Sequence, residues 1–313
     1  MRPRMAGQRT VALKLKLITK MVSRVKNISR ENPSQRELNY LLDHFKAGKH
    51  FETQQLALSV VKKYPKHQFA WKILGMLFGQ SGKQNEALNA NQESVKLSPN
   101  DSVAHNNLGN TLKNLGRLHD AEISFRRAIQ LKPDYTLAHN NLGVTLKALN
   151  RPKDAEKSYR KAIAVNPNYA DAHNNLGNTL KELGQLDASE ASLRRAIKLN
   201  PDNAKALNNL GVTLQAMGKS DDAVKSYRKA ILLDPHYADA HYNLGNSLKE
   251  SNKLEEAKTA YLEVIALQPS HAEAHNNLGI IYKGLGKLEC AEANYGRAIA
   301  LRPNFVEAYN NLG

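Results

Sequence analysis

A spacing of 34 residues between like residues constrains the fold of this chain more than any other feature. Eight prolines and eight glycines recur at this interval along most of the chain. The prolines are Pro65, Pro99, Pro133, Pro167, Pro201, Pro235, Pro269 and Pro303, and the glycines are Gly75, Gly109, Gly143, Gly177, Gly211, Gly245, Gly279 and Gly313. Because a fixed period of roughly 20–50 residues indicates stacked repeats, we predict a tandem array of one short unit.

Each repeat is counted here from the residue seven places before its recurring glycine. A degenerate first unit at 34–67 keeps Gly48 and Pro65 but has Leu41 where that glycine belongs. The regular units are 68–101, 102–135, 136–169, 170–203, 204–237, 238–271 and 272–305, and a further unit, 306–313, begins and stops at Gly313. Because a solenoid needs a polar capping helix, we expect this array to be a fragment of a longer one.

Apolar residues within a repeat follow a helical period. In 102–135, Leu108, Leu112 and Leu115 are spaced i, i+4, i+7, and the same period resumes at Leu118. This pattern predicts two helices of about 13 residues per repeat, called A and B in chain order, and an all-α fold. Proline ends helix B, and the residue after it is predicted to start the next helix A. Those starting residues are Asn100, Asp134, Asn168, Asp202 and Asn304.

Net charge is concentrated at the start of the chain. The protein has 313 residues, with 45 Lys and Arg against 29 Asp and Glu. Nine of these bases and no acid lie in residues 1–30, so the rest carries 36 bases against 29 acids, a net +7. Charge therefore gives little support to nucleic-acid binding. Helical-repeat RNA readers also vary their base-contacting residues from repeat to repeat, whereas this array is uniform.

The leader, residues 1–33, is basic and partly amphipathic. Val11, Leu15, Ile18, Val22 and Val25 share one helical face. This composition fits a disordered tail, a mitochondrial transit peptide or a membrane-surface anchor, and the sequence leaves all three open. Elsewhere no apolar run is long enough to span a membrane, and a single cysteine excludes an internal disulfide and fits a reducing compartment. We expect an intracellular protein, cytoplasmic or nuclear, with mitochondrial import as the alternative.

The residues at fixed positions of each repeat carry a family resemblance. Trp71-x2-Leu74-Gly75-x2-Phe78 with Ala87, and Ala121-x3-Phe125 with Ala128 and Pro133, are the motifs that carry it. Over residues 34–313 the chain resembles the tetratricopeptide repeat (TPR) family. The resemblance implies a right-handed α-solenoid of helix–turn–helix units. Asn91 replaces the ring of helix B in 68–101, so we expect that end to be looser, and Asn150 and Asn252 replace the glycine between the two helices.

Asparagine recurs inside helix A, where it is a poor helix former. Position 6 is Asn107, Asn141, Asn175, Asn209, Asn243, Asn277 and Asn311, and position 5 is Asn106, Asn140, Asn174, Asn208, Tyr242, Asn276 and Asn310. Position 9 alternates as Asn110, Val144, Asn178, Val212, Asn246 and Ile280. Such repetition indicates a shared role for these amides, either in binding or in bridging neighbouring helices inside the solenoid.

The family resemblance implies that positions 2, 5, 6, 9, 12 and 13 of helix A line a concave groove. A carboxamide both donates and accepts, so a row of them can hold the main chain of an extended guest segment. Helices about 10 Å apart would meet such a segment at about every third residue. We call the position 6 asparagines the Asn ladder. Lysines at position 12 would favour acidic segments or form a solvated basic face: Lys113, Lys147, Lys181, Lys249 and Lys283.

No catalytic, metal-binding, cofactor-binding or small-molecule site is predicted. Histidines at position 4 lie about 10 Å apart from repeat to repeat, too far to share an ion. We expect these rings to fill the position that Trp71, Leu207 and Tyr309 fill elsewhere; they are His105, His139, His173, His241 and His275. Cys290 lies at a turn-side position, where we expect an exposed, inert thiol.

The function predicted from the sequence is a non-catalytic scaffold that binds extended protein segments. The phrase Asn-Asn-Leu-Gly-Asn also resembles the TPR arms of O-linked N-acetylglucosamine transferases, in which an Asn ladder holds the protein substrate. This resemblance implies, as the alternative, a substrate-recruiting arm whose catalytic domain lies outside this chain. The sequence leaves the partner and the oligomeric state open.

Overall fold

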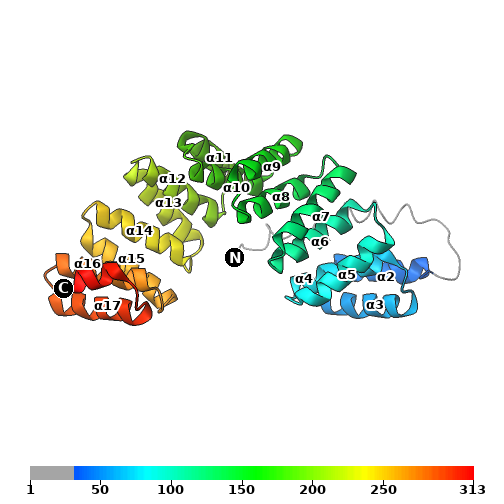
Figure 1. Ribbon diagram of the computed structural model, residues 1–313, viewed down its shortest axis with the longest axis horizontal. Coiled ribbons are helices and arrows are strands. Elements are labelled where there is room, and N and C mark those ends of the chain that lie inside the picture. Colours follow the sequence, from blue (N-terminus) through cyan, green and yellow to red (C-terminus); the bar gives the residue numbers. More distant parts are fainter. Residues whose placement is uncertain (1–31) are drawn as a thin grey trace. The chain divides into compact units, whose positions relative to one another are not determined.

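The computed structural model describes residues 32–313, which form helices joined by short turns and contain no strand (Figure 1). The leader at 1–31, and with it the alternatives for a tail, transit peptide or anchor, lies outside the described residues. The chain divides into two compact units at the bond between Thr145 and Leu146. Each unit is described by itself.

The first unit holds the degenerate repeat and the repeats up to the middle of α8. Even-numbered helices are the A helices and odd-numbered ones the B helices. The bounds are α2 Gln35–Lys46, α3 His50–Lys63, α4 Gln68–Gln80, α5 Gln84–Leu97, α6 Ser102–Asn114, α7 Leu118–Leu131 and α8 Thr136–Ala148, whose last three residues belong to the second unit. The expected pair of helices per repeat is therefore present from residue 35 onward.

The second unit continues the same alternation. Its helices are α9 Pro152–Val165, α10 Ala170–Glu182, α11 Leu186–Leu199, α12 Ala204–Ala216, α13 Ser220–Leu233, α14 Ala238–Glu250, α15 Leu254–Leu267, α16 Ala272–Gly284, α17 Leu288–Leu301 and α18 Val306–Leu312. Helix A has 13 residues and helix B has 14 in each regular repeat of this unit that is complete. The sequence period therefore fixed the helix lengths closely.

The turn between helices A and B needs one residue in the left-handed region. Glycine supplies it in most repeats, as at Gly116 with φ 75°. Asn150 and Asn252 adopt the same conformation with φ 57° and 55°. Asparagine is the residue besides glycine that most readily tolerates this geometry, so the prediction for these two positions is confirmed.

The predicted starts of the A helices are wrong by one position. Asp134 and its counterparts form a tight turn with the preceding proline, and the helix-capping residue is the next one. Asp101 accepts hydrogen bonds from the backbone N–H of Val103 and Ala104, and Asn203 accepts one from Ala206. The turn places the residue after proline too early in the chain to reach the exposed N–H groups of helix A.

Glycine in helix A allows an aromatic ring of helix B to pack against it. A Cβ atom added to Gly211 would lie 2.4 Å from Cε1 of Tyr227. Gly109 stands in the same relation to Phe125. These rings are among the largest fully buried side chains, so in most repeats the core is a ring packed against a helix that has no side chain there, while Leu193 takes this place against Gly177.

The rings at position 4 fasten each repeat to the loop before it. Nε1 of Trp71 donates to the carbonyl oxygen of Pro65 at 2.7 Å. The five position 4 histidines place Nε2 at 2.8–3.3 Å from the equivalent proline carbonyl, six residues earlier. The histidines therefore take the same position as the tryptophan, as expected, and their Nε2 atoms are engaged by the backbone.

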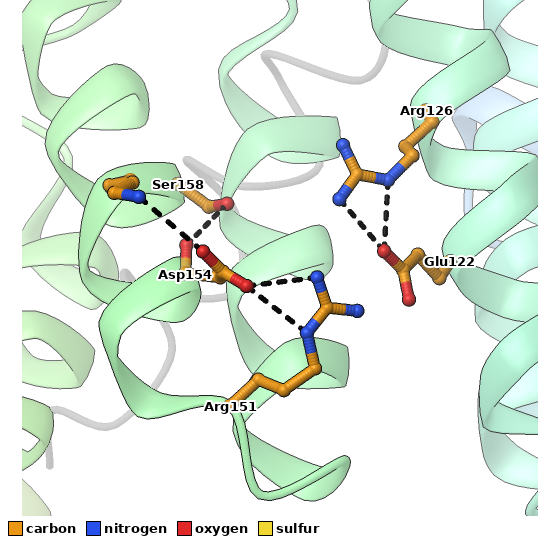
Figure 2. Close-up of polar contacts among 6 residues, drawn as sticks. Glu122, Arg126, Arg151, Asp154 and Ser158 are labelled. Atoms are coloured by element: carbon orange, nitrogen blue, oxygen red, sulfur yellow. Dashed lines mark hydrogen bonds and ion pairs between the residues drawn. The ribbon is translucent and has the colours of Figure 1, made fainter.

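Charged side chains on the B helices pair along their exposed face. Figure 2 shows Arg151 donating to the carboxylate of Asp154, with Nη2 to Oδ2 at 2.9 Å, while Ser158 donates to the carbonyl oxygen of Asp154. Arg126 pairs with Glu122 one turn earlier in α7 (Figure 2). Exposed pairs of this kind contribute little to stability, and they leave most of the B-helix charges neutralised locally.

Successive A helices pack side by side within each unit. Helix α4 contacts α6 in the first unit, and α10 contacts α12, α12 contacts α14 and α16 contacts α18 in the second. Successive B helices approach each other less closely. Because the A helices are closer together, their side is the inner, concave side of each unit.

Candidate functional site

Asparagine side chains connect several successive A helices in both units. Nδ2 of Asn209 donates to Oδ1 of Asn174 at 3.0 Å, and Nδ2 of Asn243 donates to Oδ1 of Asn208 at 3.0 Å. The same bond joins Asn141 to Asn106 in the first unit and Asn311 to Asn276 in the second. Position 6 of one repeat therefore donates to position 5 of the repeat before it.

The asparagines at positions 5 and 6 differ in how exposed their side chains are. The position 5 side chains that accept it are buried, with Asn208 at 5% and Asn174 at 6% exposed. The position 6 side chains Asn209 and Asn243 are half-buried, and their Oδ1 atoms accept no hydrogen bond within the described chain. For Asn209 and Asn243 the bridging alternative therefore accounts for one amide hydrogen each. An acceptor and a second N–H remain on the concave side.

The first regular interface lacks this bond because position 5 is a lysine. Nζ of Lys72 lies 2.6 Å from Oδ2 of Asp101, and both side chains are almost fully buried. Gln68 donates to the same carboxylate oxygen at 2.9 Å. Asn107, which would bridge to position 5, has a buried Nδ2 with no partner. The row of bridges therefore starts at Asn106 and not at the first regular repeat.

Tyr242 interrupts the row in the second unit. Its hydroxyl accepts a hydrogen bond from Nδ2 of Asn277 at 3.3 Å, and the same Nδ2 donates to Oδ1 of Asn246 at 3.1 Å. Lys249 donates to Oδ1 of Asn277 at 3.2 Å. Asn277 is 8% exposed, so this predicted ladder residue uses its amide within the protein. The ring of Tyr242 lies 4.8 Å from that of His271.

The side chains at position 9 alternate between a polar asparagine and an apolar valine or isoleucine. Asn110 and Asn178 are half-buried and form no hydrogen bond within the described chain, while Asn246 accepts one from the Tyr261 hydroxyl at 2.8 Å. Val212, at the same position one repeat away, packs against the hydrophobic core of the second unit. The concave side therefore carries alternating polar and apolar side chains.

The lysines at position 12 fall into two groups. Nζ of Lys147 forms an ion pair with Glu182 at 2.8 Å. Lys113, Lys181 and Lys249 form no ion pair within residues 32–313, and burial lowers the pKa of both Lys113 and Lys249. The fifth, Lys283, is exposed and reaches the carbonyl oxygen of Asn311 at 3.4 Å. A partly buried ammonium without a carboxylate is a favourable place for an anion.

Sequence reasoning missed the acids that create this division. Glu182 and Glu250 lie at position 13, and each meets position 12 of the preceding repeat: Lys147 in one case and Gln215 in the other. Because position 13 is acidic only at Glu182 and Glu250, which lie two repeats apart, this spacing was visible in the sequence. Tyr242 was visible too, as the one break in the row at position 5.

The remaining candidates carry no cluster of reactive groups. Cys290 is a free, exposed thiol, as expected from its turn-side position. Within the part of the chain that the structure describes, no three His, Cys, Asp or Glu side chains lie close enough to hold a metal ion. In residues 32–313 no helix has both the length and the apolar surface needed to cross a membrane.

Most of the array matches models of one repeat family. A model described as tetratricopeptide repeat matches residues 102–135, 136–169 and 204–237. A second with the same description matches 158–191 and 226–259, and a model described as TPR repeat matches 177–218, 245–286 and 281–313. Together these matches cover 102–313. A comparison with curated protein sequences found no match.

Several solved structures share this fold. A chain of the Cut9–Hcn1 hetero-tetramer of APC/C is similar over 95% of this chain and 58% of its own length, with TM-score 0.66 and 17% identity. PilF of Pseudomonas aeruginosa is similar over 67% of this chain and 95% of its own, with TM-score 0.61 and 22% identity. YrrB is similar over 59% of this chain and 96% of its own, with TM-score 0.50 and 22% identity. At such identities the likeness concerns the fold.

Proposed function

Because the chain belongs to the tetratricopeptide repeat family, we propose that it is a non-catalytic scaffold that binds extended polypeptide segments on the concave side of its A helices. YrrB, a structure with the same fold, is described as a TPR protein with an unusual peptide-binding site. The fold therefore supports peptide binding as a class of function. The residues that would do the binding are proposed from this chain alone.

One observation carries the proposal: the position 6 amides are held in place and still have open polar groups. The bridges at Asn209 and Asn243 fix the orientation of each amide before any guest arrives. Pre-organisation of this kind lowers the entropy that binding would otherwise cost. Each amide then offers Oδ1 to a guest N–H and its second hydrogen to a guest carbonyl. Such contacts hold a main chain without selecting its side chains.

The test replaces three amides of the second unit together, Asn175, Asn209 and Asn243, by alanine. The assay measures binding of fluorescent 12-residue peptides of random sequence by anisotropy. Since each hydrogen bond contributes about 0.5–1.5 kcal/mol, we expect an affinity loss of about tenfold or more. Unchanged affinity would contradict the proposal.

A matched control separates binding from stability. The position 5 oxygens lose their donors in the triple variant, so its thermal unfolding is followed by circular dichroism beside the binding assay. Asn85→Ala with Asn89→Ala, both on the exposed face of α5, removes the same kind of side chain outside the concave side. This control variant is expected to bind the peptides as the parent chain does.

A second candidate is the substrate-recruiting arm of a protein glycosyltransferase of the O-linked N-acetylglucosamine type. The recurrent phrase Asn-Asn-Leu-Gly-Asn, present at 106–110 and 174–178, is the observation that favours it. Transcript sequence beyond the codon for Gly313 is the test. A continuation into an α/β glycosyltransferase domain would support this candidate, and a stop codon within two further helices would contradict it.

A further inference from the structure

The concave side of the second unit repeats every two A helices and not every one. We call an A helix with Asn at position 9 a polar rung and one with Val or Ile there an apolar rung. Helices α10 and α14 are polar rungs, with Asn178 and Asn246, while α12 and α16 are apolar rungs, with Val212 and Ile280. The period of the binding surface is therefore 68 residues, twice the period of the fold.

From α8 to α14 charge follows the same alternation, which ends at the apolar rung α16, where Lys283 contacts the carbonyl oxygen of Asn311. Lys181 and Lys249 extend from the polar rungs and have no carboxylate partner within residues 32–313. On the apolar rungs before them, Lys147 is paired with Glu182, and Gln215 is hydrogen-bonded to Glu250. The acids thus occupy the position 12 side chains of the apolar rungs. Glu250 raises the pKa of Lys249, but burial acts more strongly and lowers it.

The spacing of the rungs fits a polyproline II segment. Packed helices are about 8–10 Å apart, and a polyproline II helix advances about 9 Å in its three-residue turn. Every third side chain of such a guest would face one A helix, and every sixth would face a helix of the same kind. The backbone of this conformation has no internal hydrogen bonds, so its C=O groups and the N–H groups of its non-proline residues are available to the Asn ladder.

We propose that the second unit selects extended segments with acidic side chains six residues apart and an apolar side chain midway between them. The two carboxylates meet Lys181 and Lys249, and the apolar side chain packs on Val212. This inference rests on the proposed function, because Asn175, Asn209 and Asn243 would hold the main chain between those points. It adds a sequence pattern to a surface that otherwise binds any extended chain.

The experiment compares proline-rich peptides of one composition and different spacing. The matching peptide contains Glu-Pro-Pro-Leu-Pro-Pro-Glu, and its isomers place the two glutamates four or eight residues apart. Two ion pairs at half-buried positions should favour the matching peptide by about fivefold in anisotropy titrations. The preference should shrink in 0.5 M salt, because ions screen partly exposed pairs (at about this concentration the screening length falls to roughly 4 Å).

Variants then assign the preference to the polar rungs. Lys181→Gln with Lys249→Gln should remove the preference for the six-residue spacing and leave the weaker isomers as they were. Lys147→Gln is the matched control, because that lysine is already paired with Glu182, and it should keep the preference. A larger loss in the control than in the double variant would overturn the assignment.

The outcomes distinguish this inference from the function on which it rests. If all spacings bind equally and the triple alanine variant of the ladder abolishes binding, the pattern is wrong and the scaffold function stands. If peptides with lysine in place of glutamate bind more tightly, the charge assignment is wrong. If no peptide of any spacing binds, the proposed function and this inference both fall.

Discussion

Two interfaces between repeats solve the same packing problem with different chemistry. Between 68–101 and 102–135, the buried side chains are the Lys72–Asp101 ion pair and Asn91, whose Oδ1 is buried without a partner. Between 204–237 and 238–271, the corresponding side chains are the Asn208–Asn243 bridge and the ring of Tyr227. The backbone follows the same pattern of two helices per repeat at both places.

The comparison shows that the helical frame tolerates either solution, while stability and binding capacity depend on which one is present. A ring packed over glycine buries a large apolar surface. Asn91 in that place buries a polar amide and contributes less apolar surface to the core. The ion pair also consumes the position 5 side chain that an amide bridge would use. We therefore expect the first interface to be the weaker one and to contribute little to guest binding.

Replacing the Tyr227 ring by asparagine, the residue found at this position in the first interface, should have the largest effect on stability. Tyr227→Asn copies the state of Asn91 into the second unit and removes a ring that is 2% exposed. Loss of a buried ring costs about 3–5 kcal/mol, so we expect the free energy of unfolding of that region to fall by about 4 kcal/mol. Urea titration followed by hydrogen exchange on α12 to α15 measures it.

The reverse exchange tests the same comparison from the other side. Asn91→Tyr places a ring over Gly75, and its hydroxyl would lie near Thr111, the residue to which Nδ2 of Asn91 donates. We expect stabilisation by about 1 kcal/mol, because a buried oxygen without a partner is removed as the ring is added. Destabilisation by this variant would show that the first interface is packed around asparagine.

Breaking the buried ion pair should have the second largest effect, after the loss of the Tyr227 ring. Lys72→Met keeps the length of the side chain and leaves the carboxylate of Asp101 almost buried without its cation. We expect a loss of about 3 kcal/mol, seen as faster hydrogen exchange in α4 to α6. Lys63→Met removes an exposed partner of Glu37 and should leave exchange unchanged. Equal effects from the two variants would contradict the importance of burial.

Acid should loosen the first interface by a smaller amount. Burial alone would raise the pKa of Asp101, but the Lys72 ammonium and hydrogen bonds from Lys72, Ala104 and Gln68 hold it below its usual value. The stability that this carboxylate contributes is present above its unfolded-state pKa of about 3.9 and is lost as pH falls through the lower folded-state pKa. The hydrogen-exchange protection factors of α4 to α6 should therefore fall as the pH drops below about 4.

The second unit provides the reference for that measurement. Its equivalent interface is closed by the neutral Asn208–Asn243 bridge, so helices α12 to α14 should respond less to the same change in pH. Asp101→Asn should flatten the acid response of the first interface. An equal response in both interfaces would place its origin elsewhere.

The candidate site was predictable in its residues and not in its contacts. Regular recurrence of Asn209 and its counterparts marks a shared role, since asparagine inside a helix is otherwise unfavourable. Whether such an amide points at a guest or at a neighbouring helix depends on how far one A helix is shifted along the next. The sequence of a single repeat does not determine this shift. The structure places one N–H on the neighbour and leaves Oδ1 open.

Asn107 and Asn277 show the same dependence on the neighbour. Both have the residue type and position of the other ladder members. Asn107 lacks an acceptor because the preceding repeat supplies Lys72, and Asn277 is fully engaged because the preceding repeat supplies Tyr242 and Asn246. Their capacity to bind a guest is thus decided by side chains 31–35 residues away in sequence.

By itself, the sequence determined the repeat length, the helix pairs and the turn residues, because each follows from spacing within one repeat and from local backbone preference. Only the tertiary structure decided the bridges between repeats and the lysines left without a carboxylate. These depend on how one hairpin is offset against the next, and that offset is set by packing between residues far apart in the chain.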